Sequence, residues 1–351
     1  MTSLRRCTRV GVNLTWRCNW SCKTCFYRYN DSLHTPFDYT IDEVTIEMTK
    51  AKARGCNHVV AVGYGEPMLY PYINDFVTVA KNIGLKSSII TNGSVSVSSF
   101  EKLYELGLNH LHISVHDLDE RLDAISGVKN SGKKQAAVKE FLRDNKLPWR
   151  SNTTLQSRNY DNLENITLNV VENGVFHVVL LGFLPHYEWS DKSKADEVVV
   201  PPDVLRPYIE KACDSLLEAK RLFTIRYHPM CHLSPRLWKY VVNAKYVLHD
   251  PWEWEYGHSG ESDTQFKISA TKLGNECSIK TEPCTSCVLY LHCGGWNGTN
   301  VKLCNVQLKS IRVQDVPDEY KEVINIYGGL HMLNPANNLT GSYDETIYTN
   351  N

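Results

Sequence analysis

Three cysteines near the start of the sequence form the group best suited to chemistry. Cys18, Cys22 and Cys25 are separated by three and by two residues, and they directly follow the apolar run from 10 to 14. Soft thiolate ligands select iron–sulfur clusters or zinc. Three thiolates in one short loop can hold three irons of a [4Fe–4S] cube. The fourth iron would then be left open.

Alternating strands and helices must position this loop. Thr40 and Glu43 form a capping box, and apolar residues at helical spacing follow it until Gly55. The same alternation continues along the chain and predicts strands at 10–14, 59–62, 87–90, 110–115, 149–155 and 175–183. The predicted helices cover 41–54, 73–83, 98–106 with Ser98 as cap, 135–142, 161–173 and 202–220. Six strands alternating with helices predict an α/β fold with a parallel sheet and helices outside it.

The chemical motifs all follow predicted strands. The cysteine loop follows the first strand, and the next three strands are followed by Gly63–Pro67, Thr91–Gly93 and His116–Asp117. In a parallel α/β barrel, the loops at the carboxyl ends of the strands form the active site. These motifs are therefore expected to lie at one end of the sheet.

Together these features resemble the radical S-adenosylmethionine superfamily. The resemblance rests on the cysteine spacing, its place after the first strand, and Gly63-Tyr64-Gly65-Glu66-Pro67 about forty residues later. It implies a partial (β/α)6 TIM-like barrel, which periodicity alone does not distinguish from a doubly wound sheet. It also implies that the amino and carboxyl groups of S-adenosylmethionine occupy the open iron, and that the reduced cube cleaves the sulfonium to a 5′-deoxyadenosyl radical.

A three-cysteine zinc or redox site is the alternative for Cys18, Cys22 and Cys25. A closed structural zinc site needs four ligands, and no second cysteine pair at finger-like spacing follows nearby. The resemblance also has a departure. The superfamily usually has an aromatic residue directly before the third cysteine, whereas this chain has Thr24, so Phe26 or Tyr27 is expected to contact the adenine instead.

Further cofactor contacts are implied by the resemblance. Gly65, Glu66 and Pro67 are similar to the Gly-Gly-Glu-Pro segment that binds the methionine amino group, with Tyr64 in place of the first glycine. The other implied contacts come after the third, fourth and fifth strands and are Asn92, Ser114, His116 and Asn152. A solvated loop imidazole is the alternative for His116. His110 and His112 are expected to face the helical layer or a strand end and receive no role.

The later cysteines are similar to those of SPASM and twitch extensions. Cys284, Cys287 and Cys293 match that spacing in part, but Asn297 stands where a further cysteine would be. The resemblance implies one auxiliary [4Fe–4S] cluster, with Cys231 as the first candidate for the fourth ligand and Cys277 as the second. A structural zinc site is the alternative, because thiolate spacing does not distinguish the two metals.

Composition limits the partners and the location. The chain has 38 Lys and Arg against 39 Asp and Glu, and no long basic run, so nucleic acid is not the expected partner. It has no apolar signal segment and no window long enough to cross a membrane, so a cytoplasmic protein without membrane contact is expected. Without a signal segment, the clustered cysteines are expected to serve as metal ligands and not as disulfides. Cys7, Cys56 and Cys213 lie outside both clusters and are expected to be buried apolar residues.

The sequence therefore predicts a radical S-adenosylmethionine barrel at 1–220, a smaller cysteine-rich domain at 221–310 and a partly flexible extension at 311–351. We expect an enzyme that removes a substrate hydrogen and completes a net oxidation, either a dehydrogenation or a cross-link, with the auxiliary cluster. The alternatives are an epimerase with Cys304 as hydrogen donor, a ribosomal-peptide-modifying enzyme, and a non-catalytic iron–sulfur or zinc binding protein. The expected partners are a small-molecule or peptide substrate and an electron donor such as flavodoxin or ferredoxin. A small metabolite is favoured because nothing before the first strand could form a peptide-recognition domain.

Overall fold

The computed structural model describes most of the barrel region and part of the rest. The described residues are 9–22, 24–25, 37–62, 65–184, 197–242, 254–256, 267–268, 278–290 and 293–321. The chain divides into two compact units. The first comprises Met1–Asn152, Glu172–Val175 and Asp250–Ser269, and the second comprises Thr153–Val171, Phe176–His249 and Ala270–Asn351.

A parallel sheet forms the centre of the first unit. Its strands pair in chain order, each parallel to the one before: β1 (Arg9–Asn13), β2 (His58–Val62), β3 (Lys86–Thr91), β4 (His110–Ser114) and the start of β5 (Trp149–Leu155). On the other edge of β1 lies the parallel strand β9 (Trp254–Tyr256), which pairs antiparallel with β10 (Lys267–Ile268). The sequence predicted the first five strands but not this late segment beside β1.

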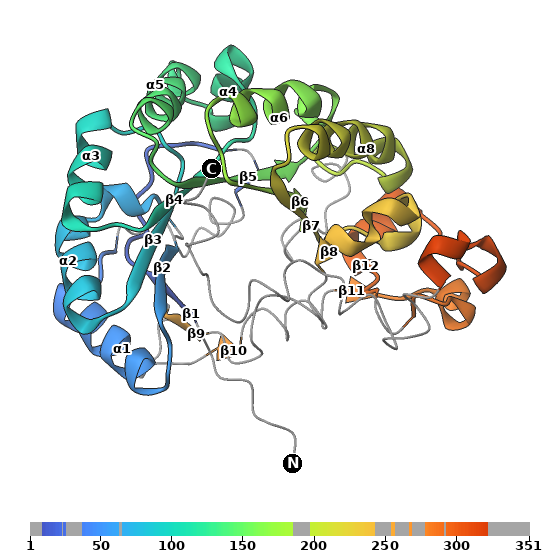
Figure 1. Ribbon diagram of the computed structural model, residues 1–351, viewed down its shortest axis with the longest axis horizontal. Coiled ribbons are helices and arrows are strands. Elements are labelled where there is room, and N and C mark those ends of the chain that lie inside the picture. The colour runs from blue at the N-terminus through green and yellow to red at the C-terminus, as the bar shows by residue number, and fades with distance from the viewer. Residues whose placement is uncertain are drawn as a thin grey trace. The chain divides into compact units, whose positions relative to one another are not determined.

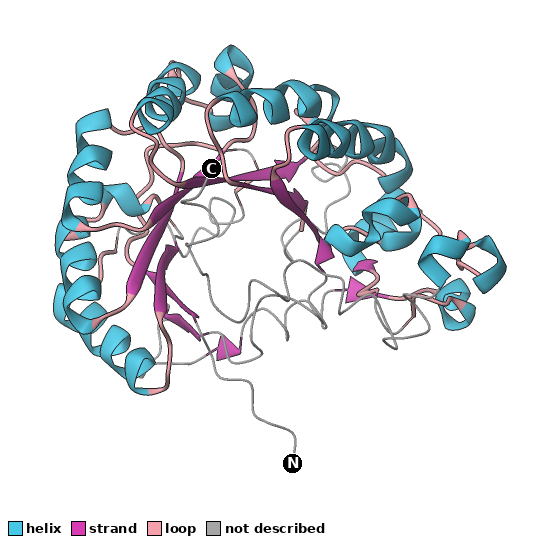
Figure 2. Cartoon of the chain, in the orientation of Figure 1, coloured by secondary structure: helices cyan, strands magenta, loops and turns pink. Residues whose placement is uncertain are grey.

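Helices connect the strands of the first unit and cover one face of its sheet. They are α1 (Ile41–Ala53), α2 (Ile73–Ile83), α3 (Val97–Leu106), α4 (Asp119–Ser126) and α5 (Ser131–Asp144). Figures 1 and 2 show α1, α2, α3 and α5 on the same side of β1 to β4. Side chains without solvent exposure fill the layer between helices and sheet, among them Val44, Met48, Phe76, Ala61, Ile89 and Leu111.

Short sequence signals set the helix ends. The capping box at α1 is present, since Thr40 accepts from the Glu43 amide and Glu43 accepts from the Thr40 amide at 2.8 Å. Gly84 ends α2 in the left-handed conformation, with φ of 78°, which favours glycine. The predicted cap of α3 is wrong: Ser96 is the N-cap and Ser98 lies inside the helix, because the extended backbone ends at Ser96.

The histidines of β4 face away from the helices, contrary to one of the two sequence expectations, while His110 lies at a strand end, as the other allowed. A Cβ built on Gly93 would lie 3.1 Å from Ile113 and 3.3 Å from Gln135 of α5, so Ile113 is on the helical side of the sheet. Because strand residues alternate between faces, His110 and His112 lie on the opposite face. There the Nε2 atoms of these two rings are 2.8 Å apart.

Parallel strands also form the centre of the second unit. The end of β5 is followed by β6 (His177–Gly182), β7 (Leu222–Arg226) and β8 (Val241–Val242), and β7 is parallel to both β6 and β8. The helices α6 (Leu163–Glu172) and α8 (Pro202–Glu218) precede β6 and β7. β7 and β8 lie within the range 221–310 that the sequence assigned to the smaller cysteine-rich domain. Strands joined in chain order by helices confirm the predicted α/β partial-barrel class.

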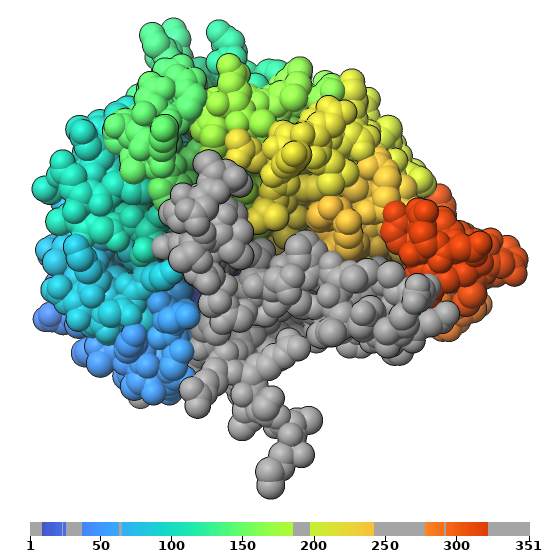
Figure 3. All heavy atoms as spheres, viewed as in Figure 1, coloured from blue at the N-terminus to red at the C-terminus, as the bar shows by residue number. Residues whose placement is uncertain are grey.

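The rest of the second unit consists of short elements. These are the 3-10 helices η6 (Met230–His232), η7 (Pro235–Tyr240), η9 (Glu282–Ser286) and η10 (Val313–Asp315), the antiparallel pair β11 (Ser278–Ile279) and β12 (Trp296–Asn297), and the helix α10 (Gly298–Cys304). In Figure 3 the red residues beyond 300 lie beside the gold residues near 240. The ammonium group of Lys309 forms an ion pair with the carboxylate of Asp203, at the start of α8, at 3.0 Å. Among the helices of the described residues, none is long and apolar enough to cross a membrane.

Candidate functional site

The cysteine loop directly follows β1, as predicted. Cys18 is exposed, and Cys22 and Cys25 are partly buried. The amide of Trp20 donates to Cys18 Sγ at 3.4 Å, and Trp20 itself is 4% exposed. The buried indole thus anchors the loop while the thiol of Cys18 stays accessible.

The base of the loop is paired with the predicted methionine-binding segment. Gly65 donates to the carbonyl of Thr15 at 3.1 Å, and Glu66 donates to the carbonyl of Arg17 at 2.6 Å. A Cβ on Gly65 would lie 2.1 Å from the Arg17 carbonyl oxygen, a distance that no side chain tolerates. Glycine is therefore required at position 65 by the close approach of the cysteine-loop backbone.

Glu66 is buried, and its carboxylate accepts three hydrogen bonds from the protein. Its carboxylate accepts from the amides of Met68 and Asn92 at 3.0 and 2.6 Å and from the Thr91 hydroxyl at 2.6 Å. Burial raises its pKa to about 7, against these hydrogen bonds, which lower it. The side chain ties the end of β2 to the end of β3, whereas its contact with a methionine amino group stays a prediction. Pro67, next to it, begins the 3-10 helix η3 (Pro67–Leu69).

The side chain of Asn92 contacts the cysteine loop. Its Nδ2 donates to Asn19 Oδ1 at 2.8 Å, and Asn19 Nδ2 donates to Ser94 Oγ at 3.0 Å. Ser94 returns two hydrogen bonds to Asn92 Oδ1, from its amide at 2.9 Å and from its hydroxyl at 2.8 Å. Asn92 and Ser94 are buried, and Asn19 is exposed. Sequence reasoning assigned Asn92 to the cofactor and did not include Asn19 or Ser94.

The end of α4 holds the loop from another side. Ser21 donates to the carbonyl of Ser126 at 2.6 Å, and a Cβ on Gly127 would lie 2.8 Å from the Ser21 Cβ. The sequence did not predict α4, so this contact was not foreseen. The loop is therefore fixed at both Asn19 and Ser21, next to Cys18 and Cys22.

The predicted contacts on β4 and β5 lie side by side. Ser114 and Asn152 are register partners on these parallel strands, and Val115 donates to the Asn152 carbonyl at 3.0 Å. His116 follows directly, and burial lowers its pKa to about 4, so the ring is neutral at physiological pH. A neutral imidazole can accept or donate a hydrogen bond without adding charge.

Gln135 joins two of these strand ends and was missed by sequence reasoning as a site residue. From α5, its Nε2 donates to the carbonyls of Asn92 at 2.8 Å and Ser114 at 3.1 Å, and the residue has no solvent exposure. The available signal was a polar residue on the sheet-facing side of a predicted helix. Tyr27 and Tyr64 lie outside the described residues.

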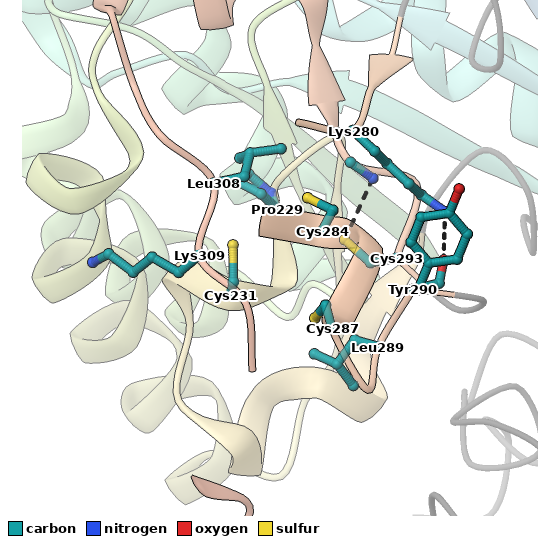
Figure 4. Close-up of a pocket in the computed structure, with 11 residues that line it drawn as sticks. Pro229, Cys231, Lys280, Cys284, Cys287, Leu289, Tyr290, Cys293, Leu308 and Lys309 are labelled. Carbon is teal, nitrogen blue, oxygen red and sulfur yellow. Dashed lines mark hydrogen bonds between the residues drawn. The ribbon is translucent and has the colours of Figure 1, made fainter. Parts of the chain in front are cut away.

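The later cysteines come together in one pocket of the second unit. Figure 4 shows Cys231, Cys284, Cys287 and Cys293 on its walls, with apolar side chains such as Leu289 and Leu308. Their elements are η6, η9 and the segment before β12. The structure therefore gathers the three spaced cysteines with the first candidate for the fourth ligand. Cys277, the second candidate, lies outside the described residues.

Each of these sulfur atoms has a polar neighbour. The amides of Ile311 and Gly295 donate to Cys287 at 3.3 Å and to Cys293 at 3.4 Å. A backbone hydrogen bond from Lys309 reaches Cys231, and the Thr281 hydroxyl lies 3.8 Å from Cys284. Amide donors directed at three of the sulfurs, with a hydroxyl near the fourth, fit a thiolate metal site, where such hydrogen bonds stabilise the anionic ligands.

Burial opposes thiolate formation in this pocket without a cation. Burial, with a smaller contribution from the neighbouring thiols, raises the pKa of Cys231 to about 12. Burial also raises the pKa of Cys293. Across the described residues, no three Cys, His, Asp or Glu side chains already stand where they could hold one metal ion. The four cysteines therefore suit a metal site by the chemistry of their sulfur ligands and by lining one pocket.

The remaining described cysteines are distributed as follows. Cys56 and Cys213 are 1% and 0% exposed, and they belong to the apolar core, as predicted. Cys304 packs in the cluster of Cys284, Trp296 and Leu308.

The sequence and the fold both match known proteins. The sequence model of the Radical SAM superfamily matches residues 12–168. A probable GTP 3′,8-cyclase from Sulfurisphaera tokodaii is 29% identical over 202 residues, which cover 54% of this chain and 63% of that protein. A PqqA peptide cyclase from Xanthomonas campestris is 26% identical over 193 residues, which cover 53% of this chain and 49% of that protein.

A solved structure shares the fold over most of the chain. Streptococcus suis SuiB, crystallised with S-adenosylmethionine, matches with a TM-score of 0.61 at 15% identity, over 88% of this chain and 76% of that chain. The chain spans less than two thirds of the length of the two cyclases.

Proposed function

We propose that this chain is a radical SAM superfamily enzyme, since residues 12–168 match the sequence model of that family, and that Cys18, Cys22 and Cys25 hold a [4Fe–4S] cluster whose open iron binds S-adenosylmethionine. The observation that supports this most is the docking of the cysteine loop on Gly65 and Glu66. Two motifs about forty residues apart in the sequence are adjacent in the structure. The superfamily requires this adjacency, since one motif binds the cluster and the other the methionine group.

Different residues at the strand ends are proposed to bind different groups of S-adenosylmethionine. The backbone around Gly65 and Glu66 presents carbonyl groups and a carboxylate to the methionine amino group, a cationic partner. Ser114 and Asn152 offer hydroxyl and amide groups to the ribose and carboxylate, and His116 adds a neutral ring. When bound, the cluster and S-adenosylmethionine supply an electron and a primary carbon radical that removes a substrate hydrogen.

We further propose that Cys231, Cys284, Cys287 and Cys293 hold an auxiliary [4Fe–4S] cluster. Four thiols in one pocket, with donors directed at the sulfurs, support this proposal. Such a cluster can accept an electron from a substrate radical, because cluster potentials span about −700 to +450 mV. The proposed overall reaction is therefore a net oxidation of a small molecule or a peptide, with flavodoxin or ferredoxin as electron donor.

The first test is anaerobic incubation with dithionite and S-adenosylmethionine. The reconstituted protein should release 5′-deoxyadenosine, and the variant with Cys18, Cys22 and Cys25 all changed to Ala should release none. Cys56→Ala is the matched control, since Cys56 is buried away from the loop, and it should behave like the unchanged protein. Equal release from the triple variant and the unchanged protein would refute the proposal.

The second test counts metal in the anaerobically purified protein. Two clusters predict about eight iron and eight sulfide per chain. Cys284→Ala should lower both to about four. About four iron with one zinc would assign the second site to structural zinc and remove the basis for the oxidation.

A further inference from the structure

The cysteine loop is tied to the end of β3 by two separate routes. The first route passes through Glu66. Its amide donates to the Arg17 carbonyl, and its carboxylate accepts from the Asn92 amide, each at 2.6 Å. Through side chains, Asn92 donates to Asn19 at 2.8 Å. Because Arg17 and Asn19 flank one cysteine, the two routes form a closed ring of contacts around Cys18.

The polar atoms of Asn92 are already used within this ring. Its Nδ2 donates to Asn19, and its Oδ1 accepts both hydrogen bonds from Ser94. Gln135 also donates to its carbonyl at 2.8 Å. A side chain with these partners is committed to holding another segment of the chain.

We propose that Asn92 is a positioning residue, which acts through Asn19 to fix Cys18 relative to the Glu66 segment. The cysteine loop and the methionine-binding segment are then held in one orientation. The inference rests on the proposed function, because it takes Cys18 to be a cluster ligand.

The exposure of the residues sets the size of the effect. Asn92 and Ser94 are buried, but water competes for the amide of the exposed Asn19. A hydrogen bond to an exposed group contributes a free energy at the low end of the usual range. Its loss should therefore raise the population of the open cysteine loop about three- to tenfold.

The experiment compares Asn19→Ala, Asn92→Ala and the double variant. In the apoprotein, the rate of Cys18 alkylation by iodoacetamide is measured by peptide mapping, and alkylation of the buried Cys213 in α8 reports any global unfolding. In the reconstituted protein, the rate of iron release to a chelator and the dissociation constant of S-adenosylmethionine are measured. Asn109→Ala is the matched control, because Asn109 binds the Ser87 amide at 2.7 Å at the opposite end of β3.

Each single variant should raise Cys18 alkylation and iron release about three- to tenfold. The double variant should not exceed the larger single effect, because both residues act through one contact. Asn109→Ala should change neither rate by more than about twofold, even where it lowers the melting temperature.

Two results would overturn the inference. One is an unchanged alkylation rate in Asn19→Ala, a substitution at an exposed position where folding is not at risk. The other is weaker S-adenosylmethionine binding in Asn92→Ala alone, with normal thiol and iron rates, which would make Asn92 a direct cofactor contact. Failure of the unchanged protein to bind a cluster would instead refute the proposed function, and the alkylation comparison would still test the positioning role.

Discussion

Gly65 is the residue whose side-chain space is most clearly forbidden near the cysteine loop. A methyl group there would lie 2.1 Å from the Arg17 carbonyl oxygen and 2.6 Å from the Trp16 carbonyl carbon. Both atoms belong to the backbone that leads into Cys18. The motif that the sequence presents as a ligand-binding glycine is therefore also a packing requirement of the cysteine loop.

We predict that Gly65→Ala displaces this loop. The variant should fold, because α1 and the core below β2 are not involved, but its iron content should fall by more than half and S-adenosylmethionine binding should be lost. Iron analysis and equilibrium dialysis measure the two effects. Gly174→Ala is the control for a general loss of stability, since nothing lies within 4 Å of that Cβ position but its φ of 76° disfavours alanine, so this variant should lose stability and keep its iron. Normal iron content in Gly65→Ala would show that the loop is not docked as described.

The candidate site residues lie at the carboxyl ends of β1 to β5, and α5 is hydrogen-bonded to the ends of β3 and β4. Gln135 is the connection, through its hydrogen bonds to the carbonyls of Asn92 and Ser114. Without the Gln135 amide, these two buried carbonyl groups would lose a hydrogen bond, which would lower the free energy of unfolding by about 1–3 kcal/mol each.

We predict that Gln135→Met weakens S-adenosylmethionine binding about tenfold while the iron content stays normal. Methionine has a similar volume, so the change removes the hydrogen bonds and leaves the packing nearly unchanged. Isothermal titration under anaerobic conditions measures the affinity. An unchanged affinity would mean that α5 does not determine the spacing of these strand ends.

The sequence predicted the alternating elements and the motif positions because both depend on local signals. The capping box at Thr40, the glycine after α2 and the apolar strand at 59–62 are readable within a few residues. The link between Asn19 and Asn92 joins residues 73 positions apart, and the pairing of β9 with β1 spans more than two hundred. Such contacts depend on the folded chain, so no local pattern contains them. The faces of His110 and His112 follow from alternation, but which face the helices cover was assigned wrongly.

At the scale of the whole molecule, buried neutral histidines limit stability in acid. The pKa of His112 is lowered well below its ordinary value, first by burial and then by the charge of Arg150. Burial also lowers the pKa of His116 to about 4 and that of His228 to about 3. These folded-state values lie below the ordinary 6.5 of the unfolded chain. The unfolded chain therefore takes up protons first as the pH falls below that value.

We predict that the free energy of unfolding falls between about pH 7 and about pH 5, by about 2 kcal/mol for each of the buried rings of His112 and His228 and by less for the partly exposed ring of His116. Glu66 acts in the opposite direction, because its raised pKa restores stability as the pH falls from about 7 towards 4.5. One carboxyl group does not offset three histidines. Urea denaturation at the two pH values measures the change, and His112→Gln should show a smaller fall. Equal stability at both values would contradict the neutral, buried state of these rings.

The central claim is that three cysteines leave one iron of the cluster open for S-adenosylmethionine. The most direct measurement is electron–nuclear double resonance on the reduced protein with S-adenosylmethionine carrying ¹⁵N in the amino group and ¹⁷O in the carboxylate. We predict hyperfine coupling from both labels to the cluster, present in the unchanged protein and absent in Cys18→Ala. No coupling from either label in a protein that holds its cluster would contradict the claim, because a fourth ligand would then occupy the iron.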